Sequence, residues 1–235
     1  MKNTFNMKTI VENKRRILMS LFGVVICAIS VGIFKIAALG VDPFQSLMAG
    51  LDKLIPIDFG TLYVIVNVIL LSFALITDRH YIGLATFINL FLLGYITDFT
   101  HKCLQKVFVN PSMVVRVVCL LVAIVIICFG SAFYMTADLG VSTYDAVALV
   151  MANTWKIGQF KFIRIATDLV CVIAGGVIFV LGGGAIKDIP TIIGVGTIVT
   201  AFFMGPLIEF FNVKFARPYL AKDKKAEEPA KIEEI

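Results

Sequence analysis

The charged residues of this chain are confined to short segments, between which lie apolar stretches of about 17 to 24 residues. A helix of ~20 residues crosses the ~30 Å hydrocarbon core of a bilayer, so each stretch is long enough to span one. Stretches such as 117–133 show no polar face for water. The composition agrees, since 59% of the 235 residues are hydrophobic and 16% are charged. The sequence predicts an all-α, polytopic transmembrane helix bundle in a lipid bilayer.

Six spans are expected, at about 17–39, 61–77, 81–100, 114–137, 162–181 and 189–211. The first exceeds the apolar core of a signal peptide, about 7–15 residues long, so we interpret it as part of the fold. A basic segment, 1–16, precedes the spans, and a charged tail, 214–235, follows them. Basic residues that flank spans mark the cytoplasmic side. We therefore expect both termini to be cytoplasmic, and we do not interpret the net charge of +5 as nucleic-acid binding.

Two motifs occur twice in the same order: 38–44 returns at 138–144, and 82–86 returns at 193–197. Between these motifs, Asn67 falls opposite Asp168. This order predicts two tandem repeats, which we call the first half (residues 17–109) and the second half (residues 110–213).

Each half contains a helix break followed by a short helix. Gly40 and Gly140 suit the left-handed conformation that ends a helix. The short segments that follow, 42–54 and 142–155, would form helices of about 20 Å, too short to cross a bilayer.

The short segments also begin with helix-capping residues. In the first half Asp42 caps, Pro43 suits the first helical position, and Gln45 can reach back to the cap. In the second half Ser142 caps and Asp145 reaches back.

The topology depends on whether these short helices cross. If they dip in and return, the chain has six spans, the halves are inverted, and 15 of the 21 Lys and Arg residues lie inside. If they cross, there are eight spans, the halves are parallel, and 18 lie inside. The charge rule favours crossing and helix length favours dipping. We predict six full spans plus two short broken or re-entrant helices.

The break at 39–44, with its short helix, resembles that of the YczE/YyaS/YitT family of bacterial membrane proteins. The glycine-led third span, from Ile82-Gly83 to Asp98-Phe99, is similar to that family too. The second half departs from the pattern, because Thr143 occupies the proline position. The resemblance covers about 17–211 and implies a bacterial inner-membrane protein. It implies no substrate, since the family is largely without an assigned activity.

Two polar residues lie inside matching spans, Asn67 and Asp168. A buried acid costs about 2.5–3.5 kcal/mol at a helix centre, so its presence needs a reason. Arg164 lies four residues earlier on the same helical face and could pair with Asp168. The structural interpretation is therefore an ion pair that holds the helix, and the functional one is a substrate or proton site.

Asp42 and Ser142 begin the two short helices, and in many transporters broken helices of this kind hold the substrate. The simpler interpretation is that both residues only cap. The functional hypothesis is one central cavity between the halves, lined by Asp42, Asn67, Ser142 and Asp168, with Arg164 as a further binding residue.

Two functions from different classes remain open. The first is a transporter of a small molecule or ion. The second is a non-transporting accessory protein that docks another protein through its basic N-terminus and charged tail; the sequence does not identify this partner. No HExxH, GxSxG or other catalytic set occurs, and the five cysteines form no CxxC pair. We expect no enzyme activity, no cofactor and no metal site.

Overall fold

The computed structural model describes residues 7–226. Residues 1–6 of the basic segment and 227–235 of the charged tail lie outside the described residues. None of the described residues forms a strand. The long helices are α1 (Met7–Ala37), α3 (Phe59–Thr77), α4 (Leu84–Val107), α5 (Met113–Thr136), α7 (Phe160–Leu181) and α9 (Val195–Phe211). The short helices are α2 (Pro43–Leu54), α6 (Thr143–Leu149), α8 (Ile189–Ile192) and α10 (Arg217–Ala226).

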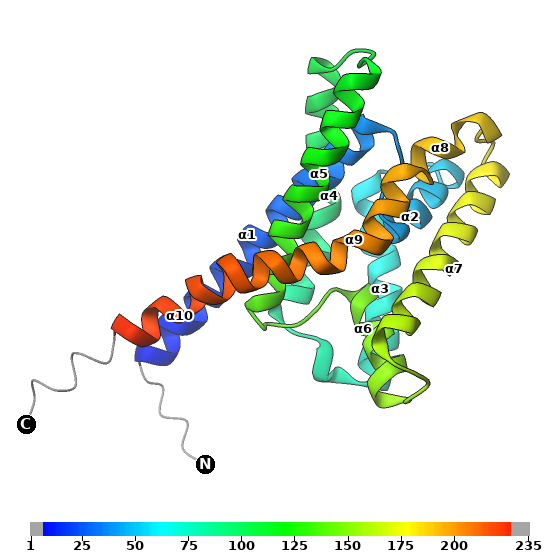
Figure 1. Ribbon diagram of the computed structural model, residues 1–235. Coiled ribbons are helices and arrows are strands. Elements are labelled where there is room, and N and C mark those ends of the chain that lie inside the picture. Colours follow the sequence, from blue (N-terminus) through cyan, green and yellow to red (C-terminus); the bar gives the residue numbers. More distant parts are fainter. Residues whose placement is uncertain (1–6, 227–235) are drawn as a thin grey trace, which may run out of the picture.

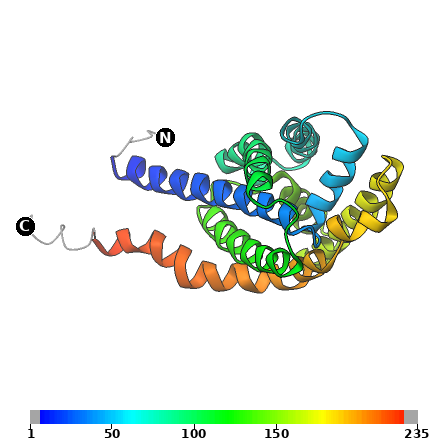
Figure 2. The same ribbon diagram turned by 90° about the horizontal axis from the view of Figure 1, so that it is seen from above.

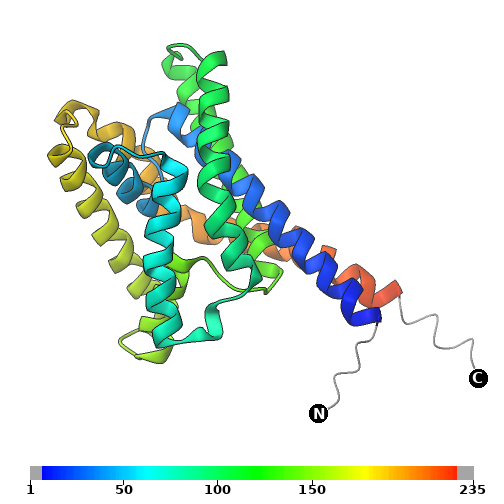
Figure 3. The same ribbon diagram turned by 180° about the vertical axis from the view of Figure 1, so that it is seen from behind.

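The long helices alternate in direction, and the short helices do not change this order. α1 ends and α3 begins near the upper end of the molecule in Figure 1. The chain between them, which includes α2, therefore returns to the end of the molecule at which α1 ends. α5 ends and α7 begins near the lower end, and α6 lies between them on that side (Figure 3). Each half thus contains three long helices, and each long helix of the first half runs opposite to the corresponding helix of the second half.

Five segments of the described chain are long and apolar enough to cross a membrane, the property expected of an all-α polytopic membrane bundle. They are 14–37, 59–77, 113–136, 162–181 and 186–204. α4 is long enough but more polar, because it extends seven residues beyond the expected end at 100 and includes Asp98, His101 and Lys102.

The span expected at 189–211 is interrupted. α8 ends at Ile192 and α9 begins at Val195, with Gly194 in extended conformation between them. The expected span therefore contains a break in the helix, and residues on both sides of it make backbone hydrogen bonds to the break near Gly40.

Each helix break is held by backbone hydrogen bonds to the other half. Gly40 has φ 98° and Gly140 has φ 106°, the left-handed region that glycine adopts without strain. At the first break, Val41 N–H donates to the Ile192 carbonyl at 3.3 Å and Gly196 N–H donates to the Leu39 carbonyl at 2.8 Å.

The second break makes the matching bonds. Val141 N–H donates to the Tyr81 carbonyl at 3.1 Å, and Ala85 N–H donates to the Leu139 carbonyl at 2.9 Å. Non-helical backbone inside a membrane protein needs such partners, because lipid supplies none. The two breaks are therefore fixed points of the fold.

Each short helix also packs on a long helix of the other half. α2 contacts α7 so closely that a Cβ on Gly50 would collide with the Gly175 carbonyl oxygen. α6 contacts α3, where the Thr143 hydroxyl donates to the Asn67 side-chain oxygen. The starts of both short helices are thus held at the centre of the bundle.

One pair of helices extends beyond the bundle. The beginning of α1 and α10 lie side by side and project from the rest of the molecule (Figure 2). Met19 and Ala216 are buried in this region, with Leu220 packed against them. We call this feature the terminal arm.

Candidate functional site

A cavity of about 110 Å³ lies at the centre of the bundle, between the starts of α2 and α6. Residues of its lining that carry polar side-chain groups are Asp42, Gln45, Tyr63, Asn67, Asn89, Ser131, Tyr134, Ser142, Tyr144, Asp145 and Arg164. The structure thus brings Asp42, Asn67, Ser142 and Arg164 together at one cavity. The expectation that Asp168 lines this cavity is wrong, because Asp168 is not among the lining residues.

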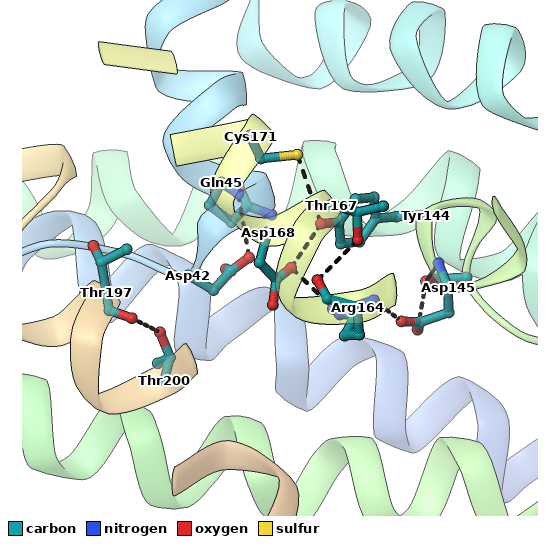
Figure 4. A network of polar contacts seen from close by, with 11 residues as sticks. Asp42, Gln45, Tyr144, Asp145, Arg164, Thr167, Asp168, Cys171, Thr197 and Thr200 are labelled. Atoms are coloured by element: carbon teal, nitrogen blue, oxygen red, sulfur yellow. Dashed lines mark hydrogen bonds and ion pairs between the residues drawn. The ribbon is translucent and has the colours of Figure 1, made fainter. Parts of the chain in front are cut away.

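Asp168 lies beside Arg164, in a network of polar contacts centred on that arginine (Figure 4). Its Oδ1 accepts a hydrogen bond from Tyr144 Oη at 2.6 Å and lies 3.3 Å from Arg164 Nε. The expected Arg164–Asp168 ion pair is therefore present. Arg164 Nη1 also pairs with Asp145 Oδ1, and the guanidinium lies over the Tyr144 ring, 4.3 Å from its centroid. One arginine therefore holds two acids and one aromatic ring.

The start of α6 uses its polar groups almost completely. Ser142 Oγ accepts from the Asp145 backbone N–H at 3.1 Å and donates to Asp145 Oδ2 at 2.7 Å. Ser142 caps the helix as expected, but Asp145 does not reach back to the cap backbone. Its carboxylate is divided between Ser142 and Arg164.

Asn67 is 1% exposed, and both polar atoms of its side chain make a hydrogen bond. Its Nδ2 donates to the Tyr63 carbonyl at 2.7 Å, and its Oδ1 accepts from the Thr143 hydroxyl. Thr143, the residue that departs from the family's proline, therefore supplies a bond that proline could not. Asn67 thus borders the cavity and also joins α3 to the start of α6.

The start of α2 is less complete. Asp42 Oδ1 caps the helix by accepting from the Gln45 backbone N–H at 3.2 Å, and none of the ion pairs among the described residues includes Asp42. Gln45 does not reach back to the cap: its Oε1 is buried and accepts no hydrogen bond from a described residue. The Gln45 side chain lines the cavity instead.

A second, larger cavity of about 600 Å³ begins where the first one ends, and we call it the outer cavity. Val31 and Gln45 line both cavities. The outer cavity is lined further by charged residues at the ends of α1, α2 and α4, among them Lys35, Asp52 and Asp98. Burial raises the pKa of Asp52, and Lys35 opposes this effect. Gln45 and Val31 thus separate the inner space from a wider opening.

Three residues of this site were not expected from the sequence. Tyr144 and Asp145 were interpreted as the start of a helix, and Gln45 as part of its cap. Phe44 and Tyr144 also stack at the centre, with ring centroids 4.9 Å apart. In the sequence, the one indication of this stacking was that Phe44 and Tyr144 occupy matching positions in the two copies of the motif, 100 residues apart. The pairing of Asp145 with Arg164 joins two helices, so no spacing along one helix could show it.

Comparisons with known proteins agree with the membrane bundle. A family model described as a family of unknown function (DUF6198) matches residues 14–213. The chain is 24% identical over 203 residues to the uncharacterised protein YyaS of Bacillus subtilis, covering 86% of this chain and 95% of the relative. It is also 24% identical over 190 residues to the uncharacterised membrane protein YczE of Bacillus subtilis, covering 80% of this chain and 81% of that protein.

A relative from Haemophilus influenzae, an uncharacterised protein, is 24% identical over 206 residues, which covers 87% of each chain. No solved structure gives a significant match to this chain.

Proposed function

The chain belongs to the DUF6198 family of membrane proteins, relatives of YyaS and YczE, and because that family has no known function we propose one from the geometry. We propose that this protein moves a small molecule or ion across a bacterial inner membrane, through the central cavity. The observation that carries the proposal is the cavity itself, bordered by Asp42, Asp145 and Arg164 in the middle of a membrane bundle. Ionisable groups are costly there and commonly belong to a solute or proton path.

The proposal includes an internal duplication with the site between the two repeats. Matched backbone bonds at the two breaks support it, since Leu39 and Leu139 accept from residues that correspond in the second motif, Gly196 and Ala85. The opposite directions of the two halves support an inverted arrangement (Figure 1). Inverted repeats with broken helices at their interface are a common plan of secondary transporters.

One-sided access also supports transport. The outer cavity approaches the central one from the side on which α4 ends, where only Gln45 and Val31 line both spaces. On the opposite side, the Arg164 network of Asp145, Asp168 and Tyr144 joins α6 to α7 next to the site. A transporter that exposes its site to one side at a time requires such an arrangement.

A binding screen followed by a flux measurement tests this function. Purified protein is screened by thermal shift against metabolites and salts of both charge signs, and each stabilising compound is then tested for counterflow in liposomes. We expect a stabilising compound that crosses the membrane, with flux lost in Asp145→Asn and kept in the outer-surface control Tyr95→Phe. Binding without counterflow would reject transport.

A second candidate function rests on the terminal arm, which projects from the bundle (Figure 2). In this alternative the protein is a non-transporting accessory that docks another protein through its arm and tails. Deleting residues 1–13 and 222–235 separates the two functions. Unchanged counterflow after the deletion favours the transporter, whereas lost cellular function with intact ligand binding favours the accessory protein.

A further inference from the structure

The central cavity contains more acids than bases. Asp42 and Asp145 line it, Asp168 lies beside Arg164, and Arg164 is the one basic residue among those that line it. Arg164 is already shared between Asp145 and Asp168. Asp42 has no such partner among the described ion pairs. An excess of negative charge in a site shielded from water favours a cation.

Two buried side-chain groups in the lining of the cavity have no hydrogen-bond partner among the described residues: Gln45 Oε1, which can only accept, and the Tyr134 hydroxyl, which can donate or accept. Gln45 is only 6% exposed, yet its Oε1 accepts no hydrogen bond from a described residue. A buried acceptor without a donor costs about 1–3 kcal/mol. The Asp42 carboxylate is a second acceptor, because it lines the cavity and belongs to none of the ion pairs among the described residues. A ligand that satisfies both Gln45 Oε1 and the Asp42 carboxylate must donate hydrogen bonds, and the Tyr134 hydroxyl can accept another one from it.

The helix starts do not reverse this preference. Helix N-termini attract anions through their free N–H groups. Here the Gln45 N–H donates to Asp42 and the Asp145 N–H donates to Ser142, so these two donors are already used. The aromatic rings of Phe44 and Tyr63 also border the cavity, and ring faces attract cations.

The size of the cavity limits the ligand. Its volume of about 110 Å³ corresponds to a few water molecules at ~30 Å³ each. We propose that the site binds a small organic cation with N–H donors, such as a primary ammonium or guanidinium group, between the Asp42 carboxylate and Gln45 Oε1. This inference rests on the proposed function and names the class of solute for the same site.

Binding of simple cations to the purified full-length protein tests the proposal. The probes are ethylammonium and guanidinium chloride, with tetramethylammonium chloride as a cation without N–H donors, and potassium chloride and sodium acetate at equal ionic strength. We expect ethylammonium or guanidinium to raise the melting temperature and to bind at least tenfold more tightly than the other salts.

Variants then locate the site. Asp42→Asn and Gln45→Met are expected to weaken binding at least tenfold, and Gln45→Met should leave the melting temperature of the empty protein unchanged or higher, because it removes an unpaired acceptor. Asp52→Asn, in the outer cavity, serves as the matched control and should bind normally. Equal stabilisation by potassium or tetramethylammonium would overturn the N–H requirement, and so would unchanged binding in both Asp42→Asn and Gln45→Met.

The test separates this inference from the proposed function. If none of the cations binds but a neutral or anionic metabolite crosses liposomes, the cation class is wrong and transport stands. If ethylammonium binds at Asp42 but no solute crosses, the site is correct and transport is wrong. Binding by acetate that is lost in Asp42→Asn would reverse the charge of the ligand and also overturn the proposal.

Discussion

At the scale of single residues, Arg164 decides how the centre of the molecule is charged. Its guanidinium joins Asp145 on α6 to Asp168 on its own helix, and it lies over the Tyr144 ring. Removing one acid leaves the other to neutralise the arginine. Losing a single partner should therefore cost less than leaving a buried cation wholly unpaired, which costs about 3–5 kcal/mol.

Asp168→Asn tests how much of this network is structural. The Tyr144 hydroxyl donates to Asp168 at 2.6 Å, and hydrogen bonds to charged groups contribute about 1.5–3 kcal/mol. We expect Asp168→Asn and Tyr144→Phe each to lower the free energy of unfolding by about 1–3 kcal/mol, and the double variant to lose little more than one of them. Unfolding in detergent measures all three.

Tyr95→Phe is the control for this series, because the Tyr95 hydroxyl is exposed and lies 3.4 Å from the Thr61 hydroxyl. It should change stability by less than about 0.5 kcal/mol. Strictly additive losses in the double variant would show that Tyr144 and Asp168 do not act as one unit.

At the scale of elements, the helix breaks are the most constrained parts of the chain. Gly40 and Gly140 combine positive φ with close contact to the backbone of the other half. A Cβ on Gly40 would lie 2.5 Å from Gly194 N, and a Cβ on Gly140 would lie 2.5 Å from Gly83 N. Neither neighbour can move without breaking the backbone bonds around it.

Alanine at these glycines separates strain from collision. In Gly183→Ala the backbone has φ 83° but a Cβ meets nothing within 4 Å, so only the conformational cost of about 1–2 kcal/mol remains. Gly40→Ala and Gly140→Ala should each cost more than this, and Gly158→Ala, with its nearest contact at 3.7 Å and no positive φ, close to nothing. We therefore expect the melting temperature to be highest for Gly158→Ala, lower for Gly183→Ala, and lowest for Gly40→Ala and Gly140→Ala. A milder loss at Gly140 than at Gly183 would contradict the close contact.

The helix breaks and the starts of the short helices could be predicted from the sequence, because residues close to them in the chain determine them. A glycine after a long apolar stretch ends one helix, and Asp or Ser a few residues later caps the next. The partner of each break could not be predicted, since Leu39 bonds to Gly196 across the whole chain. The same holds for the site: Arg164 and Asp168 share one helix, whereas Asp145 meets Arg164 only through tertiary packing.

At the scale of the whole molecule, the helix directions place the two described ends of the chain together. The beginning of α1 and α10 lie side by side, and the loop between α4 and α5 lies at the far end of the bundle (Figures 1 and 2). Basic residues are dense near both ends of the chain, so the positive-inside rule predicts that the arm lies on the cytoplasmic side.

Single cysteines test this orientation in intact cells, in a variant without the five native cysteines. We expect an impermeant thiol reagent to label Asn110→Cys, in the α4–α5 loop, and to spare Lys14→Cys and Ala221→Cys on the arm. The arm positions should react after the cells are opened, which serves as the control. Labelling of Lys14→Cys and Ala221→Cys from opposite sides would contradict the helix order itself.

The paired breaks have a consequence for biosynthesis. The ribosome makes Val141 after its partner Tyr81, so the second break can close as soon as it leaves the exit tunnel. Val41 must wait for Ile192, roughly 150 residues later, which at about 5–20 residues per second is on the order of 10 s. During that interval its amide has no native acceptor in a membrane that offers none. A nascent chain cut short before residue 191 would keep the first break open, which gives the cell's quality-control proteases a feature by which to recognise it.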